Sequence, residues 1–363
     1  MIDSVKRLLD IYEPYQHIHT QKKILYSLVG VGCGPLYSPC NRVLINWFPL
    51  EHYSKILGLF NSTAGCGLLL AQTPLTLLSQ AIGWRWCFFL IAIISVLLAT
   101  TYLIFVKGNP VSNGYPAVND SLIKDSKSTS TKEKMHQILN NMTTIISNPN
   151  FWLLGFFVFF ENGAFYNVTG IWGGPYLKEM HGYDSVKASN ALLGLSVGFC
   201  FGSLLNPYLP YLPCNAKKET LLIGTAVAIG CCIPLGFFTK SLTYVVVILL
   251  LTVHAILTAG LGTVTFPFAL DFFHPSVGAS FAGCLNFFAF FSLIVCMPVT
   301  AKVLDCFGTL PNDPDLHSPD GFKFGIWVFS MCRLALGSIF LLFVKNRKDD
   351  QIIDNISNYH SVD

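Results

Sequence analysis

The sequence predicts an all-α, polytopic integral membrane helical bundle with about nine transmembrane helices. Hydrophobic residues make up 52% of the 363 positions, and the mean hydropathy is +0.54. Charged residues make up only 12%, against about 25% in soluble domains. Apolar runs recur along the chain, and each reaches or approaches the roughly 20 residues that cross the hydrocarbon core of a bilayer.

Composition also excludes several function classes. The net charge of +3 is small and spread along the chain, so nucleic acid is not expected as a partner. Most of the 12 cysteines lie inside apolar runs, with no CxxC pair and no cysteine–histidine cluster at zinc-binding spacing. Neither a metal nor a cofactor is therefore expected. No P-loop is present, which argues against an ATP-driven pump.

The first part of the chain carries three predicted spans. A polar segment, 1–23, has no signal-peptide pattern. Apolar runs follow at about 24–48, 56–78 and 87–106, so we assign 24–106 to one unit with three transmembrane helices. The stretch 107–148 is polar and rich in Ser, Thr, Lys and Asn, which indicates an exposed linker with a short surface helix near 131–146.

The second part, 149–345, carries six predicted transmembrane helices and is followed by a tail, 346–363. The six apolar runs lie at about 151–172, 188–209, 220–238, 242–270, 278–300 and 322–344. Three prolines fall inside these runs, and we expect helix kinks there, since neighbouring helices can satisfy the freed carbonyl groups: Pro234, Pro267 and Pro298.

The distribution of Lys and Arg predicts the orientation. The side that holds the linker and the C-terminal tail carries the larger share of basic residues, so both are expected in the cytosol. An odd number of spans would then leave 1–23 outside, with the basic residues Lys6, Arg7, Lys22 and Lys23. This breaks the positive-inside rule, and it suggests that a segment is missing before them.

The order of several landmarks resembles the Major Facilitator Superfamily, specifically its helices four to twelve. One landmark set lies in the first part: Gly30, Gly32, Pro39 and Asn46-Trp47-Phe48-Pro49, then Gly58, Asn61, Gly65, Gly67, Pro74 and Gly83-Trp84-Arg85-Trp86. A second set lies beyond the linker: Ile171-Trp172-Gly173-Gly174-Pro175-Tyr176, then Asp271, Pro275, Gly278, Gly283 and Asn286. The resemblance covers about 24–345 and implies a secondary transporter that works by alternating access.

The chain departs from the family pattern in two places. The first three helices, with the glycine/aspartate/arginine loop between helices two and three, have no counterpart. The second-half copy of that loop runs from Gly202 to Pro207 and contains neither Asp nor Arg. The resemblance therefore implies an N-terminally truncated transporter, and it leaves open a non-transporting membrane remnant or a helical membrane assembly protein.

Glu161 is the sharpest candidate for function. It lies about twelve residues into a membrane-length run, where a charge costs about 2.5–3.5 kcal/mol on insertion scales. A protonatable group there can carry a proton or face a solute; equally, it can be a structural carboxylic acid bonded to a neighbour such as Asn162 or Tyr166. Asn167 follows on the same segment, so all four residues are candidates for a solute and proton pathway.

Four residues elsewhere are further pathway candidates. Asn41 and Arg42 lie near the cytosolic end of the first run, where Arg42 can bind an anion or extend to the interface. His254 has a side chain suited to proton transfer, but a buried histidine is more often a hydrogen-bonded structural residue. Asn286 suits a solute contact or an interhelical hydrogen bond.

Three glycines spaced four residues apart, Gly194, Gly198 and Gly202, form a small-residue face for close helix packing. The segment also matches the GxSxG pattern of serine hydrolases, which requires a strand–turn–helix context. Because this match lies inside a membrane-length run, we do not expect an enzyme.

The residues and the resemblance together predict a proton-coupled symporter for a small polar solute: an amino acid, an organic acid or a sugar-like compound. The expected partners are that solute, a proton and the lipid bilayer, without preference for an oligomeric state. The polar start and the free cysteines fit a bacterial inner membrane.

Overall fold

The computed structural model describes residues 36–345, apart from 117, 119–130, 212–215, 273–276 and 311–312. The polar segment 1–23, the first part of the run at 24–48 and the tail 346–363 lie outside the described residues. Four α-helices form the described part of the first unit. They are α2 (Tyr37–Trp47), α3 (Tyr53–Ala71), α4 (Thr73–Ile82) and α5 (Trp84–Phe105). A surface helix, α6 (Thr131–Ser147), occupies the end of the linker, as expected from its sequence.

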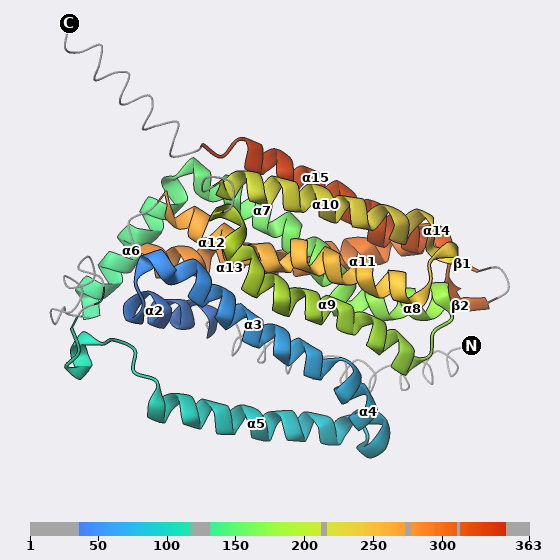
Figure 1. Cartoon of the computed structure of the whole chain (residues 1–363), viewed down its shortest axis with the longest axis horizontal. Helices are drawn as coiled ribbons and strands as arrows, with labels where there is room; N and C mark the ends of the chain where they lie inside the picture. The colour runs from blue at the N-terminus through green and yellow to red at the C-terminus, as the bar shows by residue number, and fades with distance from the viewer. Residues whose placement is uncertain are drawn as a thin grey trace, which may run out of the picture.

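The second half consists of long helices, several of them broken into segments (Figure 1). The segments are α7 (Pro149–Tyr166), the π-helix η5 (Asn167–Trp172), α8 (Gly173–His181), α9 (Ser185–Leu205), η6 (Asn206–Tyr211), α10 (Lys217–Phe237), α11 (Tyr244–Leu257), η8 (Ala259–Leu261), α12 (Gly262–Leu270), α13 (Gly278–Cys306), α14 (Pro319–Phe322), the π-helix η10 (Lys323–Val328) and α15 (Phe329–Leu342).

Among the described residues, seven helices are long and apolar enough to cross a membrane, or eight if the bent stretch from Leu139 to His181 counts as one span. α2 adds the end of a further predicted run, so the predicted count of about nine is approximate. The all-α prediction is confirmed, with one addition. A short antiparallel hairpin, β1 (Thr309–Leu310) and β2 (Asp313–His317), joins α13 to α14.

The helix breaks do not follow the interior prolines. α10 continues through Pro234, and α13 continues through Pro298. The span that contains Pro267 instead breaks at Thr258, where φ is −111° and ψ is −87°. The positions of the prolines therefore do not predict where this helix breaks. Packing against neighbouring helices determines where the backbone bends.

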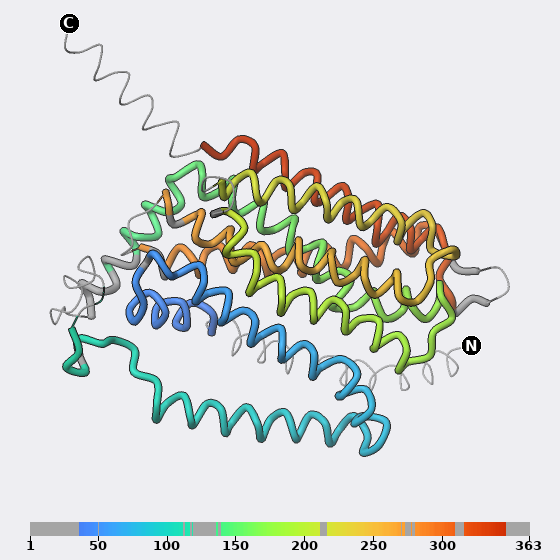
Figure 2. The backbone as a smooth tube through the Cα atoms, viewed as in Figure 1, coloured from blue at the N-terminus to red at the C-terminus, as the bar shows by residue number. Residues whose placement is uncertain are grey.

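Helix packing places α7 at the centre of the second half, between α13 and α15. α9 packs against α11 on one side and against α3 on the other, so it connects the two parts of the chain. α5 stands apart from the bundle, and Figure 2 shows its tube running beside the rest. The most apolar stretch of α5 contains no buried residue.

Candidate functional site

A polar group lies where α2 and α3 meet the second half. The hydroxyl of Tyr53 donates to Asn41 Oδ1 at 2.8 Å, and Asn41 Nδ2 donates to the backbone oxygen of Tyr37 at 3.0 Å. The Tyr37 side chain lies within interaction range of the side chains of Asn41 and Asn61 and, more weakly, of Tyr166 of α7. We call these five residues the tyrosine–asparagine group; it joins α2, α3 and α7.

Aromatic rings surround this group. The ring of Tyr37 lies 5.6 Å from Phe266 of α12 and 6.1 Å from Phe60 of α3, between ring centroids. The ring of Tyr166 stacks on Phe290 of α13 at 6.5 Å. The arrangement combines apolar walls with amide and hydroxyl groups, which is typical of small-molecule sites.

Glu161 is 2% exposed, and its Oε1 atom has no hydrogen-bond partner within the described part of the chain. Asn162 donates instead to the backbone oxygen of Val158 at 3.0 Å, and no hydrogen bond joins Glu161 to Tyr166. Neither of these two neighbours therefore makes a hydrogen bond to Glu161 among the described residues. Phe165, one turn after Glu161, contacts Phe199 at 5.8 Å, so this face of α7 is directed towards α9.

Asn167 lies at the start of the π-helix that follows α7. Its Oδ1 atom accepts a hydrogen bond from Thr300 of α13 at 2.9 Å, while its Nδ2 atom is buried with no partner in the described part of the chain. π-helical turns inside membrane spans are frequent at functional sites. The break thus places a second incompletely bonded polar side chain two turns beyond Glu161.

The remaining candidates lie apart from one another. His254 is fully buried on α11, and its Nδ1 atom lies 3.8 Å from the sulfur of Cys232 on α10. Arg42 is half-buried on α2, beside Asn41. Asn286 is half-buried on α13, three residues after Gly283, where Ser38 of α2 approaches. The structure thus brings Asn41 and Tyr166 into one group, whereas His254 lies at the contact between α11 and α10, outside that group.

Tyr37 and Tyr53 were missed by sequence reasoning. Tyr53 lies in a charged stretch, Glu51 to Lys55, that the sequence indicates as a loop, yet it begins α3 and is 3% exposed. Tyr37 stands four residues before Asn41, which is a helical spacing that could have paired them.

The three glycines of α9 face the α11 and η8 segments. A Cβ atom at Gly194 would lie 2.8 Å from Thr252 Oγ1, and one at Gly202 would lie 2.8 Å from Ile256 Cα. A Cβ atom at Gly198 would collide with the backbone oxygen of Thr252. Ser196, the serine of the GxSxG match, is fully buried inside the same helix. The helices approach closely because these positions carry no side chain.

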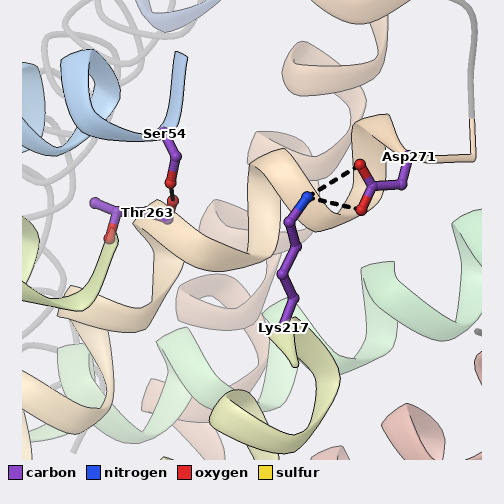
Figure 3. Close-up of polar contacts among 4 residues, drawn as sticks. All are labelled: Ser54, Lys217, Thr263 and Asp271. Carbon is purple, nitrogen blue, oxygen red and sulfur yellow. Dashed lines mark hydrogen bonds and ion pairs between the residues drawn. The ribbon is translucent and has the colours of Figure 1, made fainter. Parts of the chain in front are cut away.

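Two polar contacts lie at the end of the bundle that holds the linker (Figure 3). Ser54 of α3 donates to the backbone oxygen of Thr263 of α12 at 3.0 Å, which joins the first part to the second. Lys217 of α10 pairs with both carboxylate oxygens of Asp271, at 2.7 and 3.0 Å.

The fold defines a multi-pass helical membrane protein. The chain belongs to the Major Facilitator Superfamily, because the sequence model of that family matches residues 24–308. This family membership, together with the relatives described next, identifies a membrane transporter rather than an enzyme.

Curated bacterial relatives are transporters. The hexuronate transporter of Bacillus subtilis (strain 168) is 24% identical over 296 residues, covering 79% of this chain and 67% of that protein. A probable hexose phosphate transport protein of Chlamydia muridarum is 25% identical, covering 51% of this chain and 43% of that protein. The glycerol-3-phosphate transporter of Bacillus subtilis is 25% identical, covering 41% of this chain and 34% of that protein. The chain thus spans less than half the length of the latter two.

A solved structure shares the fold. It is a bacterial homolog to the human lysosomal transporter Spinster, in an inward-facing and unoccupied conformation. The structural alignment covers 86% of this chain and 74% of the solved chain, with a TM-score of 0.52 and 15% sequence identity.

Proposed function

We propose that this chain carries a small anionic sugar derivative, such as a hexuronate or a sugar phosphate, across a bacterial inner membrane by proton-coupled alternating access. The units 24–106 and 149–345 would rock against each other about the α3–α9 contact, with the linker 107–148 and the C-terminal tail in the cytosol. This orientation follows from the basic residues of the linker side.

The observation that carries the proposal is Glu161. A carboxylate that is 2% exposed inside a membrane span, with Oε1 unpartnered, is costly when charged. Its protonated form is favoured in the closed bundle, and it releases the proton when the surroundings open to water. Uptake of a proton together with an anion also reduces the charge that crosses the membrane.

The solute would contact the tyrosine–asparagine group. Its hydroxyl and amide side chains can donate to and accept from sugar hydroxyls. Arg42 lies next to Asn41 on α2 and is the nearest candidate in sequence for the carboxylate or phosphate of the solute. Asn162, Asn167 and Asn286 would extend the polar lining along α7 and α13, and His254 would stay outside it because its contact is Cys232.

The test is uptake of labelled glucuronate and glucose 6-phosphate into proteoliposomes, with and without an imposed pH gradient, acidic outside. We expect an acid-driven accumulation of one solute that Glu161→Gln abolishes, because glutamine cannot release a proton. Glu51→Gln, at an exposed position before α3, is the matched control and keeps the gradient dependence. Accumulation that stays equally gradient-dependent in Glu161→Gln would refute the coupling role.

A second candidate is a helical membrane component that does not transport. The exposed apolar surface of α5 favours this second candidate, because such a helix is free to pack against another chain. If the purified protein is folded and monodisperse in liposomes but moves none of the anionic sugars of the relatives, this candidate replaces the transporter.

A further inference from the structure

A pocket lies between the ends of α2 and α5. Two hydrogen bonds tie the segment after α5 to the last turn of α2: Asn46 Nδ2 donates to the Gly108 oxygen at 2.8 Å, and Trp47 Nε1 donates to the Lys107 oxygen at 2.7 Å. Beside these bonds a cavity of about 330 Å³ remains, lined by Val43, Trp47, Phe48, Phe105, Lys107 and Tyr115.

The lining is apolar and aromatic, with one cation. The rings of Trp47 and Tyr115 lie 5.7 Å apart; Trp47 lies at the end of a predicted span, where aromatic residues mark the membrane–water interface, and Tyr115 lies in the linker. The Lys107 ammonium group makes no ion pair, hydrogen bond or ring contact within the described ranges. Its positive charge is therefore available to a ligand of opposite charge.

Three other lysines on this side of the bundle have protein partners. Lys217 pairs with Asp271. Lys218 donates to the terminal carbonyl oxygens of α15, at Leu342 and Val344. The ammonium group of Lys55 lies over the ring of Tyr208 at 5.2 Å. Lys107 thus differs from these three lysines in facing a pocket without a protein partner among the described residues.

The apolar surface continues from the pocket along α5. Phe105 is 74% exposed and Leu103 is 80% exposed, and the window they belong to holds no buried residue. A ligand with hydrocarbon chains can cover this surface, whereas a water-soluble phosphate gains nothing from it.

We propose that this pocket binds an anionic phospholipid of the linker-side leaflet, with its phosphate at Lys107 and its acyl chains along α5. A basic residue beside an apolar surface at the interface is the arrangement that holds anionic headgroups. The lipid would fill the pocket between the end of α2 and the end of α5, beside the two hydrogen bonds that tie the segment after α5 to α2. Binding does not depend on the proposed transport.

The experiment measures retained lipid by native mass spectrometry of the full chain in detergent, with added dioleoyl phosphatidylglycerol or phosphatidylcholine. We expect phosphatidylglycerol to be retained in preference, and Lys107→Gln to lower its apparent affinity about fivefold, as the loss of one lysine near a membrane surface predicts. Lys345→Gln removes the same charge from the same side, outside the pocket, and retains the lipid. Val43→Trp fills the cavity and also lowers retention.

Three outcomes would overturn the site. One is equal phosphatidylglycerol retention in Lys107→Gln and the parent chain. Another is an equal loss in Lys345→Gln, which would indicate unspecific attraction to any surface lysine. The third is full displacement of the lipid by soluble glycerol 1-phosphate, which would assign the pocket to a free phosphate compound instead. Monodisperse elution of each variant shows that it is folded.

Discussion

Arg333 Nη1 donates a hydrogen bond to the backbone oxygen of Gly163 at 2.8 Å, which joins α15 to α7. The same oxygen accepts the backbone N–H of Asn167, the residue at which α7 passes into a π-helix. Arg333 is 1% exposed, and no carboxylate pairs with it among the described residues. It also contacts Phe329 O, Ser330 Oγ and the Phe329 ring, and its side chain interacts with that of Cys296 of α13. A buried charge thus holds the helix break next to Glu161.

The first prediction concerns this contact. Arg333→Ala should destabilise the bundle by about 1.5–3 kcal/mol, because charged hydrogen bonds contribute that much and the interior cannot replace them with water. Arg333→Lys should recover only part, since an ammonium group cannot reach three acceptors in a planar fork. Thermal unfolding in detergent measures both. Arg85→Ala is the control, because Arg85 is exposed and lies over the Trp84 ring. Equal melting temperatures for Arg333→Ala and Arg85→Ala would contradict the assignment.

The second prediction concerns the α9–α11 contact. Gly198→Ala should cost about 1–3 kcal/mol, because its methyl group would meet the backbone oxygen of Thr252 and force the helices apart. Gly230→Ala on α10 is the matched control, since a Cβ atom there meets nothing within 4 Å. We expect Gly230→Ala to be neutral or slightly stabilising. Comparing the two melting temperatures checks the packing; a Gly198→Ala variant as stable as Gly230→Ala would show that the helices are looser.

The third prediction concerns Cys66 of α3 and Cys200 of α9. Their sulfur atoms lie 3.8 Å apart, across the contact about which the two parts would rock. Mild oxidation with copper phenanthroline should link them, because a small side-chain rotation brings the sulfurs to the bonding distance of about 2.05 Å. The disulfide should stop any transport cycle, and dithiothreitol should restore it. Thiol counting with a maleimide of high mass detects the link.

The control for this cross-link is Cys66→Ser, which leaves Cys200 without its partner. It should lose the oxidation effect on both thiol count and uptake. Transport that continues in a chain shown to be cross-linked would contradict rocking about the α3–α9 contact, whereas it would leave the helix packing unchanged.

The fourth prediction concerns the ion pair between Lys217 and Asp271. Lys217→Asp should lower the melting temperature slightly, because two carboxylates would then face each other at the pair's position. The exchanged double variant, Lys217→Asp with Asp271→Lys, should recover most of the loss. The recovery should shrink at high salt, since both groups are partly exposed and screened. A double variant no better than the single one would show that the pair contributes nothing measurable.

The transmembrane spans were predictable from the sequence because their signal is local. The helix from Trp84 to Phe105 has a mean hydropathy of 2.5 over its most apolar part, and the predicted run at 87–106 differs from it only at the ends. Hydrocarbon solvent requires that each span bond its own backbone, so length and hydropathy suffice to locate it. The family was also predictable from the sequence, because its landmark residues lie within these spans and their short loops.

The candidate site was only partly predictable. Glu161 stood out because a carboxylate in an apolar run is rare. Tyr53 did not, since its neighbours are charged and its hydrogen bond to Asn41 crosses from one helix to another. The break at Thr258 likewise has no proline to announce it.

The sequence by itself determined that this chain is a helical membrane protein of the transporter family, because hydrophobic length is a property of each segment alone. Only the tertiary structure decided that Glu161 keeps an unpartnered oxygen among the described residues, that Arg333 bonds the backbone of α7, and that Tyr53 bonds Asn41. These relationships join residues on different helices, and inside a membrane the close packing of neighbouring helices selects which polar groups find partners.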